Sequence, residues 1–276
     1  MTIFVFTALL FLFSLFAGFL GALTGFGGAV VIIPVLVLIF KIDIHYAMGA
    51  ALISVIATSS GTTAVYVKNG YTNLRIGMFL ETAAIVGALA GALLIPYVST
   101  SFLTIVFSAL LFFSAYLSLR RKEEKENYQT SHPLAVKLKL DGSYPHKHQQ
   151  VNYHVQRAPL AFCLMGFAGL LSGLLGVGSG ALKVLSMDQA MRLPYKVSTT
   201  TSNFMIGMTA AVSAGIYFAN GYINPVIAFP VMLGVLAGAL VGTKVLTKVH
   251  TRVLRIIFSV VVCFLAAEML YKVVVG

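Results

Sequence analysis

Long apolar runs, two of which are broken by clustered glycines, constrain this chain more than any other feature of its sequence. The first broken run, from Gly18 to Pro34, reads G-F-L-G-A-L-T-G-F-G-G-A-V-V-I-I-P. The second, from Gly169 to Leu185, reads G-L-L-S-G-L-L-G-V-G-S-G-A-L-K-V-L. A glycine in a helix interior costs about 1 kcal/mol relative to alanine. Because Gly25, Gly27 and Gly28 fall within four residues, we predict that one helix ends there and another begins.

The composition indicates a protein that crosses a membrane several times. Of the 276 residues, 59% are hydrophobic and 10% are charged, and the mean hydropathy is +0.94. A soluble domain carries about 25% charged residues. Apolar runs of about 20 residues, enough to cross a hydrocarbon core of about 30 Å, alternate with short charged connections. We therefore predict an all-α polytopic membrane protein with a lipid bilayer around it.

The remaining composition excludes several other classes of protein. The net charge is +11, but the basic residues lie in the connections, so nucleic acid is not an expected partner. Cys163 and Cys263 lie within apolar runs and indicate neither a disulfide framework nor a thiolate metal site. The first apolar segment has no basic residue before it and no A-x-A-type cleavage site after it. We expect it to belong to the mature protein rather than to a signal peptide.

The apolar segments form two sets of five. Their approximate bounds are 2–23, 29–40, 46–67, 76–97 and 102–119 in the first set, and 160–175, 181–187, 197–219, 226–244 and 253–275 in the second. The second segment of each set is too short to cross alone at 1.5 Å per residue. Each set is therefore predicted to form a glycine-broken helical hairpin followed by three transmembrane helices.

A constant offset relates the two sets and indicates an internal duplication. A shift of 151 residues carries Gly25 to Gly176, Gly27 to Gly178, and Asn69-Gly70-Tyr71 to Asn220-Gly221-Tyr222; further on, a shift of 147 carries Gly87 to Gly234. We predict a first transmembrane repeat at 1–119, a hydrophilic linker at 120–157 and a second transmembrane repeat at 158–276. His146 and His148 of the linker have no carboxylate or cysteine at ligand spacing, so they are read as part of a solvated loop and no metal site is predicted.

The Lys and Arg residues predict the orientation of the chain. If each broken unit enters the membrane and returns while the other three segments cross, the repeats have inverted topology. Sixteen basic residues then gather on one side, and Lys41 and Lys272 lie on the other. An even number of crossings per repeat would divide them eleven to seven. The positive-inside rule favours the inverted arrangement, with a cytoplasmic linker and both termini outside.

The two breaks are the expected binding site. Non-helical backbone at membrane depth is tolerated where it is buried in protein or lines a cavity. The helices that begin at about Ala29 and Ala181 expose unpaired N–H groups and the positive end of the helix dipole, which suits an anion. The alternative is a glycine kink that serves helix packing alone. The predicted substrate-binding residues are Thr24, Gly25, Gly27, Gly28, Gly176, Gly178, Ser179, Gly180, Lys183, Thr201 and Asn203.

Two ionisable residues within apolar segments are functional candidates, because such residues are costly at membrane depth. Lys183 follows the second break, where the first repeat has Ile32, and is predicted to face the anion. Snorkelling to an interface or pairing with Asp188 are the alternatives. Glu81 is a candidate for carrying a coupling proton, and pairing with Arg75 is the plainer reading. For Glu268, the residue four positions on, Lys272, offers a structural partner.

The sequence shows no nucleophile motif, no metal cluster and no phosphate loop. Neither break fits G-x-G-x-x-G, and no strand precedes them, so dinucleotide binding fails on context. No cofactor and no enzymatic activity are predicted. An anion channel and a membrane-embedded enzyme of sulfur or lipid metabolism stay open as alternatives.

The glycine-broken segments, the small-polar runs T-S-S-G and S-T-T-T-S-N, and the paired N-G-Y turns resemble the TauE/SafE family of sulfite-exporter-like membrane permeases. The resemblance covers both repeats. It implies a secondary transporter of the bacterial plasma membrane that carries small anions such as sulfite, organosulfonates or related organic anions. We expect alternating access at a midplane site between the two breaks. The second repeat departs from the symmetric G-x-G-G form, since it reads G-V-G-S-G.

Overall fold

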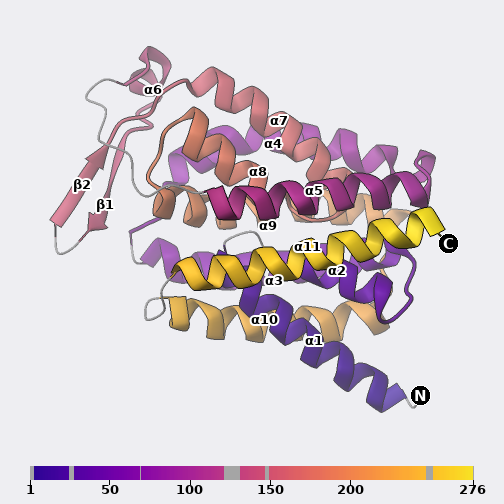
Figure 1. The fold of residues 1–276 in the computed structure, drawn as a ribbon. Coiled ribbons are helices and arrows are strands. Elements are labelled where there is room, and N and C mark those ends of the chain that lie inside the picture. The colour runs from indigo at the N-terminus through magenta and orange to yellow at the C-terminus, as the bar shows by residue number, and fades with distance from the viewer. Residues whose placement is uncertain are drawn as a thin grey trace.

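The chain folds into a bundle of long helices packed side by side (Figure 1). The computed structural model describes residues 3–24, 28–68, 70–120, 131–146, 149–246 and 251–275. The first half contains α1 (Ile3–Thr24), α2 (Ala29–Leu38), α3 (Ile44–Lys68), α4 (Leu74–Leu94), the 3₁₀ turn η1 (Ile95–Tyr97) and α5 (Thr100–Arg120). The second half contains α7 (Ala158–Leu175), α8 (Gly180–Leu185), the π-helical turn η2 (Ser186–Ala190), α9 (Tyr195–Ala219), α10 (Pro225–Leu246) and α11 (Thr251–Val275). The predicted helical segments are confirmed, with ends that differ by a few residues.

Six of the described helices are long and apolar enough to cross a membrane. They are Phe4–Ala22, Ile44–Lys68, Leu74–Tyr97, Ala158–Leu175, Tyr195–Ala219 and Pro225–Thr243. Shorter apolar helices lie at Ala29–Leu38 and Thr100–Tyr116. Large apolar side chains also remain exposed on the outside of the bundle, among them Phe4 at 82% and Val86 at 69%. A soluble protein seldom leaves so much apolar surface open, so these helices form an all-α polytopic membrane protein.

Local chemistry accounts for several helix ends. The Asn73 side chain caps α4 by accepting a hydrogen bond from the Ile76 N–H at 3.1 Å. Asn224 does the same for α10, where Val226 is the donor, at 3.0 Å. Both are short polar side chains of the kind that satisfy the first unpaired N–H groups of a helix. At its other end, α7 stops at Gly176, which adopts the left-handed conformation that glycine tolerates.

The linker contains a small folded unit, which the sequence analysis did not predict. Helix α6 (Pro133–Lys137) precedes two antiparallel strands, β1 (Gly142–His146) and β2 (Gln149–Tyr153). Residues 131–146 and 149–157 are called the linker cap below. Leu140 and Tyr153 of the cap are buried in one apolar cluster with Ile76 of α4. His148 and the side chain of His146 lie outside the described residues, so the solvated-loop reading stays a prediction.

Equivalent helices of the two halves run in opposite directions. Met48, near the start of α3, contacts Tyr217, near the end of α9, with 3.8 Å between the Met48 Sδ and the Tyr217 hydroxyl. Further along α3, the Ser59 hydroxyl donates to the Asn203 carbonyl of α9. The residue number rises along one helix as it falls along the other. Helices α3 and α9 are therefore antiparallel, although the offset of 151 residues makes them equivalent.

The close packing of glycines gives the directions of the other helix pairs. Gly169 of α7 packs against the backbone of Ala84 of α4, and Gly173 packs against Ala88, so these two helices are parallel. Small residues of this kind let helices approach closely in lipid. Helices α1 and α10, the counterparts of α7 and α4, are also parallel, since Gly238 packs on Leu15 and Gly242 on Phe19. These directions support the inverted repeat, which stays a prediction.

The two ends of the bundle differ. The chain termini lie together at one end, called the terminal end, and the linker cap lies at the other, called the linker end (Figure 1). At the terminal end, Phe40, just past α2, makes an edge contact with Phe6 near the start of α1, with 5.5 Å between ring centroids. Helix α2 therefore returns toward the point where α1 began. This is the in-and-back hairpin that the sequence predicted.

Candidate functional site

An equivalent pair of residues, Val55 of α3 and Ile206 of α9, marks the centre of the bundle. The offset of 151 residues relates the two, and each lies near the middle of its helix. Both line a small pocket of about 20 Å³, room for about one water molecule. The polar part of the pocket lining consists of Thr58, Ser59, Thr62 and Asn203.

The first break borders this pocket. Gly28, the residue before α2, lines it together with Gly21 and Ala22 of α1. Thr24 is the last residue of α1, and its side chain is outside the described part of the chain. Gly25 and Gly27 also lie outside the described residues. Of the predicted residues of the first break, the structure therefore brings Gly28 to the pocket, opposite Asn203 of α9.

The second break contacts the same central pair. Gly176, Gly178 and Ser179 have φ angles of 65°, 71° and 45°, so the helix is interrupted as predicted. Gly178 packs against Val55 and Ile206 without lining the pocket. The buried hydroxyl of Ser179 has no hydrogen-bond partner among the described residues. Gly180 begins α8, and its carbonyl accepts a hydrogen bond from the Ser202 hydroxyl at 3.3 Å.

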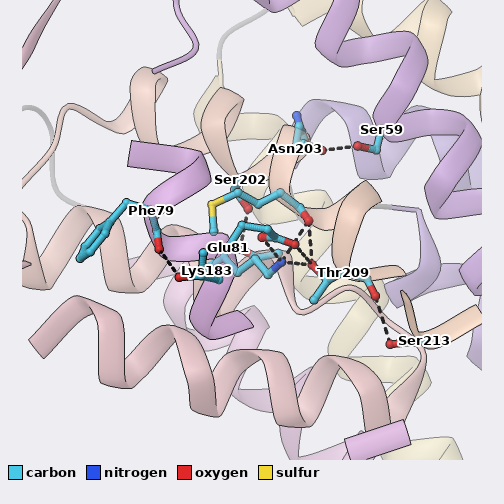
Figure 2. Close-up of polar contacts among 11 residues, drawn as sticks. Ser59, Phe79, Glu81, Lys183, Ser202, Asn203, Thr209 and Ser213 are labelled. Atoms are coloured by element: carbon cyan, nitrogen blue, oxygen red, sulfur yellow. Dashed lines mark hydrogen bonds and ion pairs between the residues drawn. The ribbon is translucent and has the colours of Figure 1, made fainter. Parts of the chain in front are cut away.

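The hydroxyl groups of the pocket donate to backbone carbonyls. Thr58 donates to the Ser54 carbonyl at 2.9 Å, and Thr62 donates to the Thr58 carbonyl at 2.8 Å, one turn back on the same helix. Ser59 donates across to the Asn203 carbonyl (Figure 2). A hydroxyl has one hydrogen to donate. In this conformation the pocket therefore offers polar, uncharged groups and no cation.

Thr201 lies away from the pocket, near the linker end. The N–H of Asn73, in the α3–α4 connection, donates to the Thr201 hydroxyl at 3.1 Å. The neighbouring Thr200 hydroxyl donates to the Tyr71 carbonyl at 2.9 Å. In this conformation Thr201 therefore holds the α3–α4 connection against α9, and its predicted contact with substrate stays untested.

A buried ion pair lies beside the second break. The Lys183 Nζ of α8 is 3.4 Å from the Glu81 Oε2 of α4, and the two side chains are 0% and 1% exposed. The residues are 102 positions apart in the chain. Figure 2 shows Glu81, Lys183 and Thr209 pointing toward one another from three different helices. The structure therefore brings together the two ionisable candidates that the sequence analysis treated separately.

The hydrogen bonds of Lys183 are complete. Its ammonium donates to the Glu81 carboxylate, to the Met205 carbonyl at 3.2 Å and to the Thr209 hydroxyl. A lysine ammonium has three hydrogens, so each one is taken. The Thr209 hydroxyl is in turn 3.0 Å from the Glu81 Oε1 and 2.7 Å from the Met205 carbonyl. Removing one partner of such a buried pair costs about 3–5 kcal/mol, because a charge is left uncompensated.

Several pairings that the sequence suggested are replaced by others. Glu81 pairs with Lys183, and the Arg75 guanidinium instead donates to the Lys139 carbonyl of the linker cap at 3.3 Å. The suggested pairs of Arg75 with Glu81 and of Asp188 with Lys183 were therefore wrong. Lys183 is fully buried, so it does not snorkel to an interface. The Lys272 ammonium donates to the Val37 carbonyl of α2 at 3.3 Å.

Thr209 is the residue of this cluster that the sequence analysis missed. A signal for it was present, since the offset of 151 residues makes it the equivalent of Thr58. Thr58 belongs to the small-polar run T-S-S-G, which carried part of the family resemblance but was given no role in the site. As for metals, no group of three or more His, Cys, Asp or Glu residues that could hold an ion occurs in the described ranges.

The long apolar helices and the apolar outer surface of the bundle define a polytopic membrane protein. The family model described as "Sulfite exporter TauE/SafE" matches residues 10–269. The chain belongs to this family.

Two relatives from Bacillus subtilis (strain 168) are similar over most of their length. One is named "Probable membrane transporter protein YdhB" and is 29% identical over 227 residues, which cover 82% of this chain and 82% of the relative. The other is named "Probable membrane transporter protein YunE" and is 24% identical over 233 residues, which cover 82% of this chain and 83% of the relative. No solved structure gives a significant match to the chain.

Proposed function

We propose that this protein is a secondary permease for small anions, foremost sulfite, organosulfonates or related sulfur-containing or organic anions. The observation that carries the proposal is Lys183, a fully buried cation in the middle of an apolar helix bundle. Ionisable residues at this depth commonly mark a substrate or ion pathway. The family description names sulfite, which supports an oxyanion as the class of substrate.

The proposed site lies around the Val55–Ile206 pair, which the second break contacts through Gly178 and which shares its pocket with Gly28 of the first break. Gly28 lines it from the first break and Asn203 lines it from α9, and Lys183 lies on the helix that follows the second break. Helix N-termini at both breaks would add N–H donors. Alternating access requires the two halves to move against each other around this centre, and the inverted directions of α3 and α9 support such a movement.

The proposed membrane is the bacterial plasma membrane, with the linker cap in the cytoplasm and both termini outside. The structure places Lys68, Arg75, Arg192 and Lys196 at the linker end, where α3 and η2 end and α4 and α9 begin. The positive-inside rule assigns that end to the cytoplasm.

The proposal predicts saturable anion flux into proteoliposomes that contain the purified protein. The panel is sulfite, thiosulfate, sulfoacetate, lactate and the zwitterionic sulfonate taurine, each measured with and without a pH gradient. Replacing Lys183 by alanine is expected to raise the half-saturating concentration by about tenfold or more, since a hydrogen bond to a charged group is worth about 1.5–3 kcal/mol.

Lys272→Ala is the matched control, because it removes a lysine that donates to a backbone carbonyl at the terminal end. Both variants are first checked for a monodisperse peak in detergent. If Lys183→Ala carries the preferred anion with unchanged affinity, Lys183 is not part of the site. Conductance that does not saturate with substrate would identify a channel instead.

A further inference from the structure

The Glu81–Lys183 pair leaves no place for a substrate anion on the ammonium. All three ammonium hydrogens have acceptors within the protein, and Lys183 is fully buried. An anion can reach Lys183 only by replacing one of these acceptors. Of the three, the Met205 carbonyl and the Thr209 hydroxyl are uncharged. Glu81 is the acceptor that a single proton can neutralise.

Resting on the proposed function, we propose that the substrate anion and Glu81 compete for Lys183, so that each anion is carried together with one proton bound to the Glu81 carboxylate. The proton comes from the water on the side to which the site is open. It adds to one carboxylate oxygen and leaves from that oxygen on the other side. The protein is thus a proton–anion symporter with one coupling carboxylate.

The net charge of the site explains why the coupling is strict. With Glu81 ionised and no anion bound, the pair is neutral. With Glu81 protonated and a monovalent anion on Lys183, the site is neutral again. A proton alone or an anion alone leaves a net charge in the middle of the membrane, which is costly. The empty carrier and the fully loaded carrier are therefore the two states that pass through the closed conformation.

Thr209 is the positioning residue of this exchange. Its hydroxyl lies 3.0 Å from the Glu81 Oε1 and 2.7 Å from the Met205 carbonyl, and it has one hydrogen to donate. When Glu81 is ionised, that hydrogen stabilises the carboxylate. When Glu81 is protonated, the hydrogen can turn to Met205, and the hydroxyl oxygen can then accept from the carboxyl group. Figure 2 shows the Thr209 hydroxyl beside both charged side chains, joined to each by a dashed line.

The number of protons carried per transport cycle follows from a difference between the two repeats in their charged residues. The equivalents of Glu81, Lys183 and Thr209 in the other repeat are Ala228, Ile32 and Thr58. The threonine is retained, but both charged positions are apolar. One proton per transport cycle is therefore expected.

Other ionisable groups on the helices around Glu81 do not share its position. Helix α4 itself carries Arg75 near its start, and the described parts of α7, α8, η2 and α9 carry Cys163, Lys183, Asp188, Tyr195, Lys196 and Tyr217. Of these, Lys183 is the group that contacts Glu81 and interacts with it electrostatically. Tyr195 and Lys196 begin α9, whereas Thr209 lies near its middle.

The test separates net transport from exchange in proteoliposomes that enclose a pH-sensitive dye. Lactate and, at mildly acidic pH, hydrogen sulfite are the monovalent probe anions, and thiosulfate and sulfoacetate are divalent ones. In the unaltered protein, an inward gradient of a monovalent anion is expected to acidify the lumen. In Glu81→Gln the empty carrier holds an uncompensated cation, so net uptake should fall by about tenfold or more. Exchange of labelled for unlabelled anion should persist, without proton movement.

Glu268→Gln is the matched control, because it removes an exposed carboxylate from α11, and it should keep both net uptake and acidification. If the Glu81→Gln variant retains net uptake with acidification, the coupling proposal is wrong, and the proposed permease function still stands. If the unaltered protein carries none of the probe anions, the proposed function fails, and the coupling proposal fails with it.

The double variant Glu81→Gln/Lys183→Met covers the case in which the single variant does not fold. It removes both charges and leaves no buried ion unpaired. We expect a folded protein that neither exchanges the probe anions nor moves protons with them. Anion-dependent acidification by this double variant overturns the proposal.

Discussion

At the residue scale, the polar side chains of the bundle are held mostly by their own backbone. Ser14, Ser108, Ser114 and Ser213 each donate to the carbonyl four residues earlier, at 2.5, 2.8, 2.8 and 3.1 Å. Lipid offers no alternative partner, so a hydroxyl in a membrane helix satisfies itself in this way. Lys183 and Glu81 cannot do so. Their charges need partners on other helices, which is why they identify the site.

The contact between the linker cap and the bundle is also decided by single residues. The Asn73 amide donates to the Tyr153 hydroxyl at 2.7 Å and to the Leu140 carbonyl at 3.0 Å. Tyr153 is 4% exposed, and burial raises its pKa to about 12. Because the raised pKa favours the protonated phenol, its contribution to stability is present below about pH 10 and is lost as the pH rises toward 12.

Tyr153→Phe is expected to lower the free energy of unfolding by about 1 kcal/mol, the usual net worth of one hydrogen bond. A thermal-stability measurement in detergent checks this, and it should also show a weaker loss of stability at alkaline pH. Tyr97→Phe is the control, since Tyr97 is 87% exposed. If Tyr153→Phe and the unaltered protein are equally stable, the hydrogen bond between Asn73 and Tyr153 does not contribute to stability.

At the element scale, the second break is a turn with a defined backbone conformation rather than a frayed helix end. Gly176 ends α7 with a hydrogen bond from its own N–H to the Ser172 carbonyl at 3.0 Å. Gly178 then brings the backbone against Ile206, where a Cβ atom would lie 2.4 Å from the Ile206 Cγ2. Gly178 therefore combines a positive φ angle with a close approach of its backbone to Ile206. Both are conditions that glycine meets and other residues meet only with strain.

Gly178→Ala is therefore expected to destabilise the protein by more than about 1 kcal/mol and to slow transport, since the Ile206 side chain must move to admit the methyl group. Gly221→Ala is the control, because Gly221 has a φ of 74° and no atom of the described residues lies within 4 Å of its missing Cβ. Thermal stability and flux are compared for the two variants. If both variants lose the same stability, backbone strain alone explains the need for glycine at position 178, and its close packing on Ile206 contributes nothing to stability.

At the scale of the whole molecule, helices of the first half pack against helices of the second half. Helix α1 packs on α10 and α4 packs on α7, so each half supplies partners for the other. Both termini lie at one end of the bundle, and the linker cap lies at the opposite end (Figure 1). The arrangement keeps the two breaks near one centre while their flanking helices come from both repeats.

A C-terminal epitope tag is expected to react with antibody on intact cells. The positive-inside rule assigns the linker end to the cytoplasm and thus the terminal end to the outside. An epitope inserted between His146 and Gln149, in the connection between β1 and β2, serves as the control and should react only after the membrane is permeabilised. The reverse pattern of reactivity would contradict the proposed orientation.

The sequence by itself determined the helical segments, the places of both breaks and the family, and it predicted the duplication. These features are local, since hydropathy and clustered glycines act within one stretch of chain. It also singled out Lys183 and Glu81 as costly at membrane depth. It gave each of them the wrong candidate partner, Asp188 and Arg75, because those residues are near in sequence.

Only the tertiary structure decided which residues meet: Glu81 with Lys183 and Thr209, and Thr201 with Asn73. The physical reason is that lipid tails are as apolar as a protein interior. Hydrophobic periodicity, which identifies the buried face of a helix in a soluble protein, therefore does not show which face of a membrane helix packs on its neighbour. Helix packing brings Glu81 and Lys183 together, although they are 102 positions apart in the chain.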